Sequence, residues 1–302
     1  MNEISGILVD GFTIGSIIGK GSIGTVFNAV DASGRPFAIK IMQTNPFLDE
    51  SVLDSVVEGA LSTSKISDCA RIVRVHKAGR TPDFHYIVMD FMQGGTLERI
   101  LEENDYPIHK KLLIGLSLSQ TIACVHSKRI IHGDIKPGNV MLDADDMPYL
   151  TDFYYSSLKK GRNILPQGTP RYMSPEQAMG LFITTSSDIY SFGVLLYELL
   201  TGKLPYKTAS GNIAGMIETV SECEIVNPAL INSNLDKGVC ALLCKLLEKK
   251  PENRYHTMEE VALVLEGCVS GKNKTGKGGG SFLKCLKERL FGKSRSGDLR
   301  KK

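Results

Sequence analysis

The sequence lacks tryptophan, and only 7% of its 302 residues are aromatic. It also lacks any apolar run close to the roughly 18 residues that cross a bilayer, so we expect no membrane-spanning helix. Residues 1–11 have no long apolar core, which excludes a signal peptide and predicts a short N-terminal extension. With 42% hydrophobic and 23% charged residues, the composition is that of a globular chain long enough for two domains or one two-lobed unit.

No C-x-x-C pair occurs among the seven cysteines, and seven is an odd number. Both features argue against a disulfide framework and against a zinc site, and they predict a protein of the reducing cytoplasm. Cys240 and Cys244 lie one helical turn apart, and we interpret them as small apolar residues of a helix rather than metal ligands.

Most of the chain has no large excess of positive or negative charge. The formal net charge is +3, but residues 271–302 hold eight Lys and three Arg against two acidic residues, so this segment carries +9 and residues 1–270 carry −6. A mildly acidic body excludes nucleic acid as a partner, because nucleic-acid backbones bind basic surfaces.

The distribution of apolar residues divides the chain in two. Short segments rich in β-branched and aromatic residues fill the first ninety residues, interrupted by a helical stretch at about 48–65. Apolar residues then recur at helical spacing. We therefore predict an α+β fold with a small β-rich lobe at about 12–92 and a larger helical lobe at about 93–268, followed by a Gly/Lys-rich linker and tail at 269–302. The expected strands are 12–18, 25–30, 36–42, 72–78 and 84–91.

Three glycines follow the first expected strand. Residues 19–26 read Gly-Lys-Gly-Ser-Ile-Gly-Thr-Val, which fits G-x-G-x-x-G-x-V. Dinucleotide-binding folds share the shorter G-x-G-x-x-G pattern, but there a helix follows the loop. Here another strand is expected, so the pattern predicts a hairpin whose backbone N–H groups can lie over phosphates.

A lysine on the third expected strand is the candidate phosphate ligand. Lys40 ends the sequence Phe37-Ala38-Ile39-Lys40, and its side chain shares a face with that of Ala38 because strand side chains alternate. By itself Lys40 is equally consistent with a surface lysine on an edge strand. A carboxylate should hold the lysine, and we favour Glu58 on the helical stretch because apolar residues flank it, with Asp54 as the alternative.

One loop carries a carboxylate, a lysine and an amide at short spacing. Residues 132–139 read His-Gly-Asp-Ile-Lys-Pro-Gly-Asn, so Asp134 and Asn139 enclose Lys136. Phosphoryl transfer uses a carboxylate at the acceptor hydroxyl and oxygen ligands for Mg²⁺. We predict that Asp134 is the catalytic base, that Lys136 offsets charge on the transferred phosphate, and that Asn139 and Asp152 bind the metal.

Taken in order, these motifs resemble those of Hanks-type (eukaryotic-like) serine/threonine protein kinases, with a texture closest to bacterial members. The resemblance covers about residues 12–268 and includes Gly-Thr-Pro-Arg-Tyr-Met-Ser-Pro-Glu at 168–176. It implies a bilobal kinase fold, protein substrates, and ATP with Mg²⁺ or Mn²⁺ as cofactors. Lys136 and Thr169 are features of the serine/threonine class.

The resemblance also assigns binding and structural roles. Met89 resembles the gatekeeper behind adenine, Asp90 to Met92 the hinge whose backbone pairs with the base, and Met141 the pocket floor; ordinary core packing is compatible with each. Structurally, Glu176 is implied to pair with Arg254, and Asp188 to anchor the catalytic loop. The implied ATP-binding residues are Ile18, Gly19, Lys20, Gly21, Ser22, Ile23, Gly24, Val26, Ala38, Lys40, Met89, Asp90, Met92 and Met141.

The predicted function is transfer of the ATP γ-phosphate to Ser or Thr hydroxyls of proteins, with autophosphorylation and a signalling role. Two alternatives stay open: a non-catalytic pseudokinase scaffold, and a small-molecule phosphotransferase of the same fold, since aminoglycoside kinases also contain His-Gly-Asp. The Asp-x-Lys spacing and the segment at 168–176 favour protein substrates, because those relatives lack both.

Two positions depart from the family pattern. Gly133 replaces the usual Arg before the catalytic Asp, and that Arg normally pairs with a phosphate on the activation segment. We therefore expect activity not to need phosphorylation at Ser156, Ser157 or Thr169 through pairing of a phosphate with that Arg. Tyr154 replaces the Gly after Asp-Phe, so easy flipping of that segment is not expected.

The tail contains a short amphipathic segment. Residues 282–291 place apolar side chains on one helical face and basic ones opposite. We weigh a solvated tail against contact with an anionic membrane surface or an acidic partner. The expected location is the cytoplasm, with the inner membrane surface as the site of any peripheral attachment; the sequence has no signal for an oligomeric state.

Overall fold

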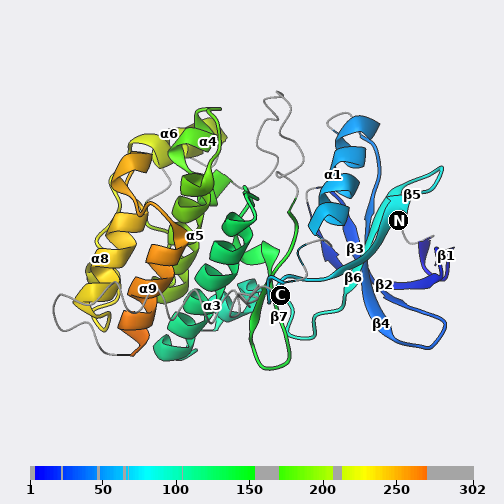
Figure 1. The fold of residues 1–302 in the computed structure, drawn as a ribbon, viewed down its shortest axis with the longest axis horizontal. Coiled ribbons are helices and arrows are strands. Elements are labelled where there is room, and N and C mark those ends of the chain that lie inside the picture. Colours follow the sequence, from blue (N-terminus) through cyan, green and yellow to red (C-terminus); the bar gives the residue numbers. More distant parts are fainter. Residues whose placement is uncertain are drawn as a thin grey trace, which may run out of the picture.

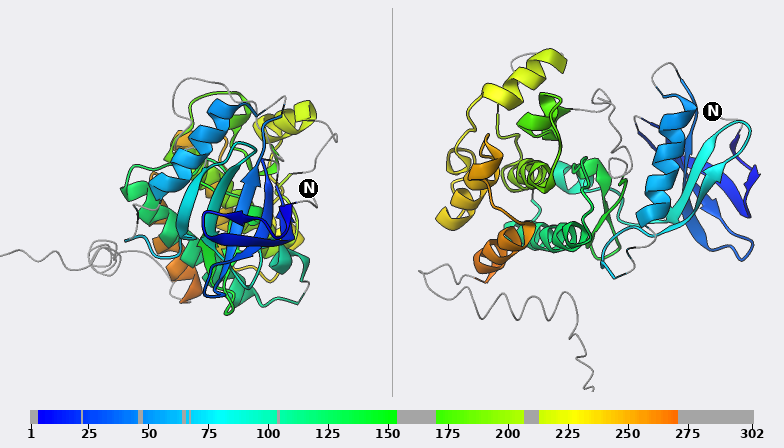
Figure 2. Two further views of the ribbon diagram at one scale, coloured as in Figure 1. Left: turned by 90° about the vertical axis from the view of Figure 1, so that its right-hand side faces the viewer. Right: turned by 45° about the horizontal axis from the view of Figure 1, so that its top comes forward.

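The computed structural model describes residues 4–21, 23–45, 48–63, 66, 68–103, 105–153, 170–206 and 213–270. A sheet with one helix forms the first part, and helices form most of the second (Figures 1 and 2). The predicted α+β, two-lobed plan is confirmed. The sheet is antiparallel with strand order β1-β2-β3-β4-β6-β5. Its strands are β1 (Leu8–Val9), β2 (Phe12–Lys20), β3 (Thr25–Val30), β4 (Pro36–Met42), β5 (Val75–Arg80) and β6 (His85–Asp90).

The sheet has an apolar cluster on each face. Alternation along β4 sends Phe37, Ile39 and Ile41 to an outer cluster. The same alternation sends Ala38 and Met42 to an inner cluster, which helix α1 (Glu50–Thr63) covers. The predicted helical stretch at 48–65 is thus confirmed to within two residues at each end. Because Lys40 lies two residues from both Ala38 and Met42 along the strand, its side chain also points to the inner face.

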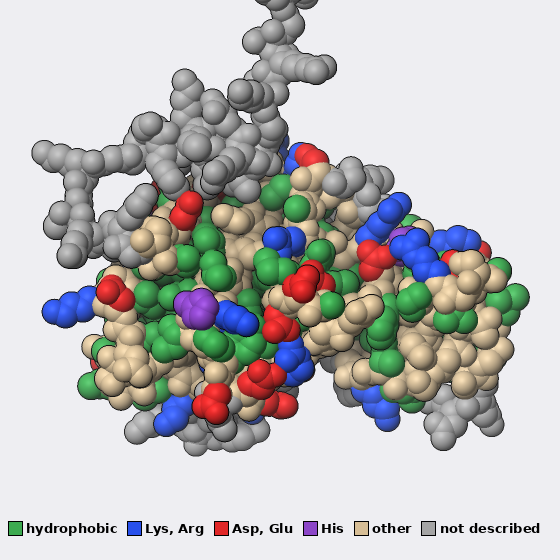
Figure 3. Space-filling model, turned by 90° about the horizontal axis from the view of Figure 1, so that it is seen from below, with side chains coloured by type: hydrophobic (Ala, Val, Ile, Leu, Met, Phe, Trp, Pro, Cys, Tyr) green, Lys and Arg blue, Asp and Glu red, His purple; other side chains and the backbone are tan. Residues whose placement is uncertain are grey.

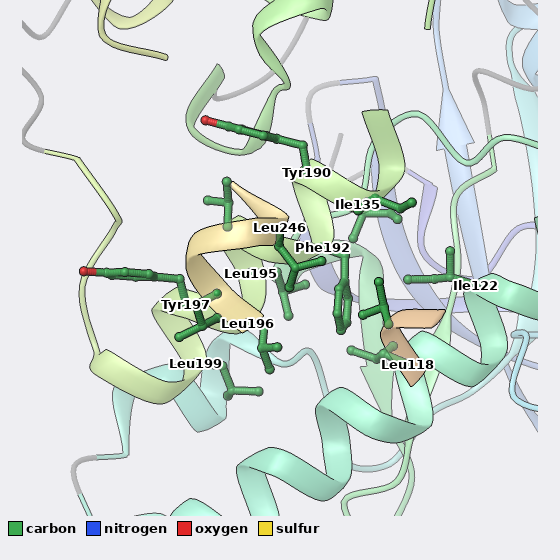
Figure 4. Packing of buried hydrophobic residues seen from close by; sticks show 14 of the residues in the cluster. Leu118, Ile122, Ile135, Tyr190, Phe192, Leu195, Leu196, Tyr197, Leu199 and Leu246 are labelled. Carbon is green, nitrogen blue, oxygen red and sulfur yellow. The ribbon is translucent and has the colours of Figure 1, made fainter. Parts of the chain in front are cut away.

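The helical part is built around α5, whose apolar side chains are drawn in Figure 4. This helix begins at a capping box in which Thr184 and Ser187 exchange side-chain and backbone hydrogen bonds, and it ends at Gly202, whose φ of +72° favours glycine. Its side chains pack against α3 and α8 in one large core. The helices are α2 (Glu98–Glu102), α3 (Ile108–Ser127), α4 (Pro175–Ala178), α5 (Thr185–Thr201), α6 (Ile213–Glu222), α7 (Pro228–Ile231), α8 (Lys237–Leu246) and α9 (Met258–Val269). Shorter elements are the hairpin β7 (Val140–Leu142) and β8 (Pro148–Leu150) and the 3₁₀ turns η2 (Pro137–Asn139), η3 (Pro170–Tyr172) and η4 (Pro251–Asn253).

The cysteine expectation needs one correction. Cys69 and Cys124 form a disulfide between the segment after α1 and helix α3, with their Cα atoms 5.7 Å apart. The two positions are 55 residues apart in sequence and share a small apolar cluster with Ile66 and Ile72. In the part of the chain that the structure covers, no group of three or more His, Cys, Asp or Glu could hold a metal.

Both acidic and basic side chains are exposed on the face drawn in Figure 3. Within the described ranges, no helix combines the length and apolar character needed to cross a membrane.

Candidate functional site

The catalytic-loop residues converge as predicted from their spacing. Lys136 Nζ donates to Asp134 Oδ2 at 2.7 Å, and Asn139 Nδ2 donates to the same oxygen at 2.8 Å. Asn139 Nδ2 also lies 2.8 Å from the backbone oxygen of Asp134, which closes the loop on itself. The Asp134 carboxylate is thus fixed by two neighbours while staying partly exposed, as a group that meets a substrate must be.

Asp188 anchors the backbone of the catalytic loop, as the resemblance implied. Its carboxylate accepts hydrogen bonds from the backbone N–H groups of His132 and Gly133, both at 2.8 Å. His126 Nε2 binds the same carboxylate at 2.8 Å. Because Asp188 is only 1% exposed, these contacts replace the water that it has lost. The sequence offered no signal for His126, which lies in the last turn of α3.

Gly133 occupies a backbone position that favours glycine. Its φ is +79°, in the left-handed region where side chains cause strain. Its carbonyl oxygen accepts from Gln177 Nε2 at 2.9 Å, which ties the loop to α4. The residue that departs from the family pattern therefore fits its place without strain.

Lys40 joins the sheet to the helical part. Its Nζ lies 2.9 Å from Asp152 Oδ2, and the lysine side chain is buried. Asp152 has a φ of +65°, a rare conformation that Asp tolerates better than most residues. On the preceding residue, the Thr151 N–H donates to Asn139 O at 3.1 Å, which places the two predicted metal ligands side by side.

The expected partner of Lys40 on α1 is not in contact with it. Glu58 is exposed, and among the described residues no contact links it to Lys40. Val56 and Ala60 are buried against the sheet, and Glu58 lies two positions from each, about 200° around the helix. The alternative, Asp54, instead binds His85 Nε2 at 2.9 Å. The packing of Val56 and Ala60 thus sets which face of α1 meets the sheet, and the apolar residues next to Glu58 in the sequence did not reveal this.

The glycine-rich hairpin forms between β2 and β3. Gly21 N donates to Gly24 O at 2.8 Å, which closes the tip, and Ser22 lies outside the described residues. A side chain at position 24 would place its Cβ 2.5 Å from the backbone oxygen of Ile41, so only glycine fits there. Ladder pairs of Gly19 with Val26 and of Lys20 with Thr25 continue the hairpin, while Ile18 is exposed.

The predicted adenine-binding side chains share one apolar cluster. Ala38 and Met89 are ladder partners and are both buried in it. Four more of the implied ATP-binding residues pack against the same cluster; they are Ile23, Val26, Met92 and Met141. The structure therefore brings together side chains from β3, β4, β6 and β7 that the sequence separates by more than a hundred residues.

A buried ion pair joins α4 to the turn before α9. Arg254 Nη1 and Nη2 donate to the two carboxylate oxygens of Glu176 at 2.8 and 2.9 Å, and Ser187 Oγ donates to the same carboxylate at 2.8 Å. Burial by itself would raise the pKa of Glu176, but Arg254 and Ser187 outweigh it and hold the pKa below its ordinary value. This is the pairing that the resemblance implied.

Thr169, together with Tyr154, Ser156 and Ser157, lies outside the described residues.

The donor set fits a magnesium-bound nucleotide. Asn139 and Asp152 supply hard oxygen ligands, and the buried ammonium group of Lys40 lies beside Asp152. A comparison with protein families matches residues 12–263 to the protein kinase domain.

The chain belongs to the protein kinase family. Relatives include the serine/threonine-protein kinase PrkC of Bacillus subtilis, 31% identical over 81% of this chain and 38% of the relative. PknB of Mycobacterium tuberculosis is 32% identical over 84% of this chain and 42% of the relative. A probable serine/threonine-protein kinase of Clostridium acetobutylicum is 30% identical over 85% and 40%. This kinase chain therefore spans about two fifths of the length of these relatives.

Proposed function

We propose that this kinase transfers the γ-phosphoryl group of ATP to Ser and Thr hydroxyls of protein substrates. The observation that carries the proposal is the convergence of Lys40, Asp134, Asn139 and Asp152 on one site from both lobes. Phosphoryl transfer needs mainly positioning and charge stabilisation, and this set supplies both.

Each residue of the set has a separate task. Asp134 orients the acceptor hydroxyl and accepts its proton, and Lys136, 2.7 Å from Asp134, places a positive charge beside the transferred group. Lys40 binds the phosphates that the glycine hairpin covers. Asn139 and Asp152 would hold Mg²⁺, which supplies charge neutralisation on the phosphate oxygens when bound.

Protein substrates are favoured over small alcohols by two features. Lys136 follows Asp134 at the spacing of the Ser/Thr class, and the 170–176 portion of the segment expected to form a peptide groove is folded beside the loop through Gln177 and Gly133. We further propose that the kinase phosphorylates itself and acts in signalling, and that its basic tail contacts an anionic surface or an acidic partner.

A transfer assay tests the proposal. Purified protein is incubated with ³²P-labelled Mg-ATP, a mixture of protein acceptors, and in parallel a panel of amino sugars and alcohols. We expect label on protein Ser and Thr, and at least a hundredfold loss in Asp134→Asn with nucleotide binding nearly unchanged. Label on the small molecules alone would support the phosphotransferase alternative, and no label with retained ATP binding would support the scaffold.

A further inference from the structure

Asp90 lies at the point where the chain leaves the sheet for the helical part. It is the last residue of β6, and residues 91–97, here called the connector, lead from it to α2. The far end of the connector is held by β7, since Leu97 N donates to Val140 O at 2.8 Å and Gly94 N donates to Leu142 O at 2.9 Å. What holds the near end decides where the backbone from Asp90 to Met92 lies.

Alternation along β6 separates the side chains of Met89 and Asp90. Met89 points into the inner cluster with the predicted adenine-binding residues. Asp90 is the ladder partner of Phe37 and shares its outer face. A residue that contacts Asp90 there can fix the connector without entering the nucleotide site.

His76 makes that contact. Its Nε2 lies 2.7 Å from Asp90 Oδ1, and its ring meets the Phe37 ring edge to face at 5.0 Å. Both members of the hydrogen bond are partly shielded, with side-chain exposures of 17% for His76 and 37% for Asp90. Arg35 is a weaker neighbour, 3.9 Å from the same carboxylate and more exposed.

A bulge in β5 aims His76 at this position. Val75 pairs with Met89 and Lys77 pairs with Val88, so two steps on β5 oppose one step on β6 and His76 is the extra residue. A bulge turns a side chain away from regular alternation. As a result, His76 and Lys77 both lie on the outer face, where Lys77 binds Asp10 at 3.0 Å. The backbone of Asp90 is held by the same stretch, since Asp90 N donates to Arg74 O at 3.0 Å.

We propose that His76 is a positioning residue for nucleotide binding, which holds Asp90 so that the backbone of Asp90 to Met92 faces the adenine. This inference rests on the proposed function, because that function makes the connector the adenine-binding hinge. His76 touches neither ATP nor the acceptor, so it should affect nucleotide affinity and leave the chemical step alone.

The test is nucleotide affinity measured directly by calorimetry, beside KM for ATP and kcat. His76→Ala should raise the Kd and KM for ATP about tenfold, the effect expected for losing a hydrogen bond to a charged group, with kcat unchanged. His76→Gln places an amide N–H near the position of Nε2 and should restore most of the affinity. Lys77→Ala is the matched control, because it removes a polar pair from the same bulge and the same face.

Two results would overturn the proposal. One is unchanged ATP affinity in His76→Ala; the other is equal weakening in His76→Ala and Lys77→Ala, which would mean general loosening of the sheet. Since affinity is measured without turnover, a wild-type protein that binds ATP but labels no protein would contradict the proposed function while leaving the test of His76 decisive.

Discussion

The carboxylate that contacts Lys40 in the structure is not the one that we expected from the sequence. Asp152 lies 2.9 Å from Lys40, whereas Glu58 is exposed on α1. Turning α1 to bring Glu58 inward would expose Val56 and Ala60, each worth roughly 1 to 2 kcal/mol of burial. We therefore expect Glu58→Gln to keep kcat and KM for ATP within about twofold of wild type in a steady-state assay with Mg-ATP.

Lys40→Met is the matched comparison for Glu58→Gln, since it removes the other half of the expected pair. It should lower turnover at least a hundredfold, because the phosphates lose their buried cation. Similar losses in both variants would show that Glu58 reaches Lys40 during turnover. Full activity of Lys40→Met would mean that a different lysine positions the phosphates.

Between elements, the disulfide links the segment after α1 to α3. Cys69 and Cys124 close a loop with a sequence separation of 55, and in the chain-entropy account such a cross-link stabilises the fold by about 4 kcal/mol. Reduction, or the variant Cys124→Ser, should lower the free energy of unfolding by about 2 to 4 kcal/mol in a urea titration. Cys223→Ser is the control, because Cys223 is free and exposed. Equal stability of oxidised and reduced protein would count against the bond.

The Glu176–Arg254 pair joins α4 to the turn before α9, and its stabilisation depends on pH. The pKa of Glu176 is held below its ordinary value of 4.5, so the pair stabilises the fold fully above that value and loses the contribution as the pH falls through the lowered pKa. Glu176→Gln leaves Arg254 buried without its counter-charge and should cost about 3 to 5 kcal/mol at pH 7. Unfolding titrations should show this gap narrowing below pH 4.5; a gap independent of pH would contradict the argument.

Across the whole molecule, local motifs were predictable and packing angles were not. The catalytic loop follows from spacing alone, because Asp134 and Asn139 are close in sequence and one turn brings them together. The rotation of α1 depends on which of its faces the sheet buries, and the Cys69–Cys124 bond depends on the packing of two segments that are 55 residues apart in sequence. The role of His76 depends on a one-residue bulge, which alternation of residue types does not reveal.

Gly133 bears on whether the activity of the whole molecule depends on phosphorylation of the activation segment. With glycine at a φ of +79°, the catalytic loop offers no cation at that position to a phosphate on the activation segment, and Asp188 and Gln177 already hold the loop through Gly133. Because these contacts involve no phosphate, we predict that the loop does not need phosphorylation to be organised. We expect protein treated with phosphatase, and a Ser156→Ala/Ser157→Ala variant, to keep an initial rate within about threefold of the untreated enzyme on a peptide acceptor. Intact mass spectrometry verifies that phosphate is absent at the start. A strong loss of rate on dephosphorylation, recovered after preincubation with Mg-ATP, would contradict the prediction. It would mean that another cation pairs with the phosphate and that activity depends on phosphorylation despite the glycine at position 133.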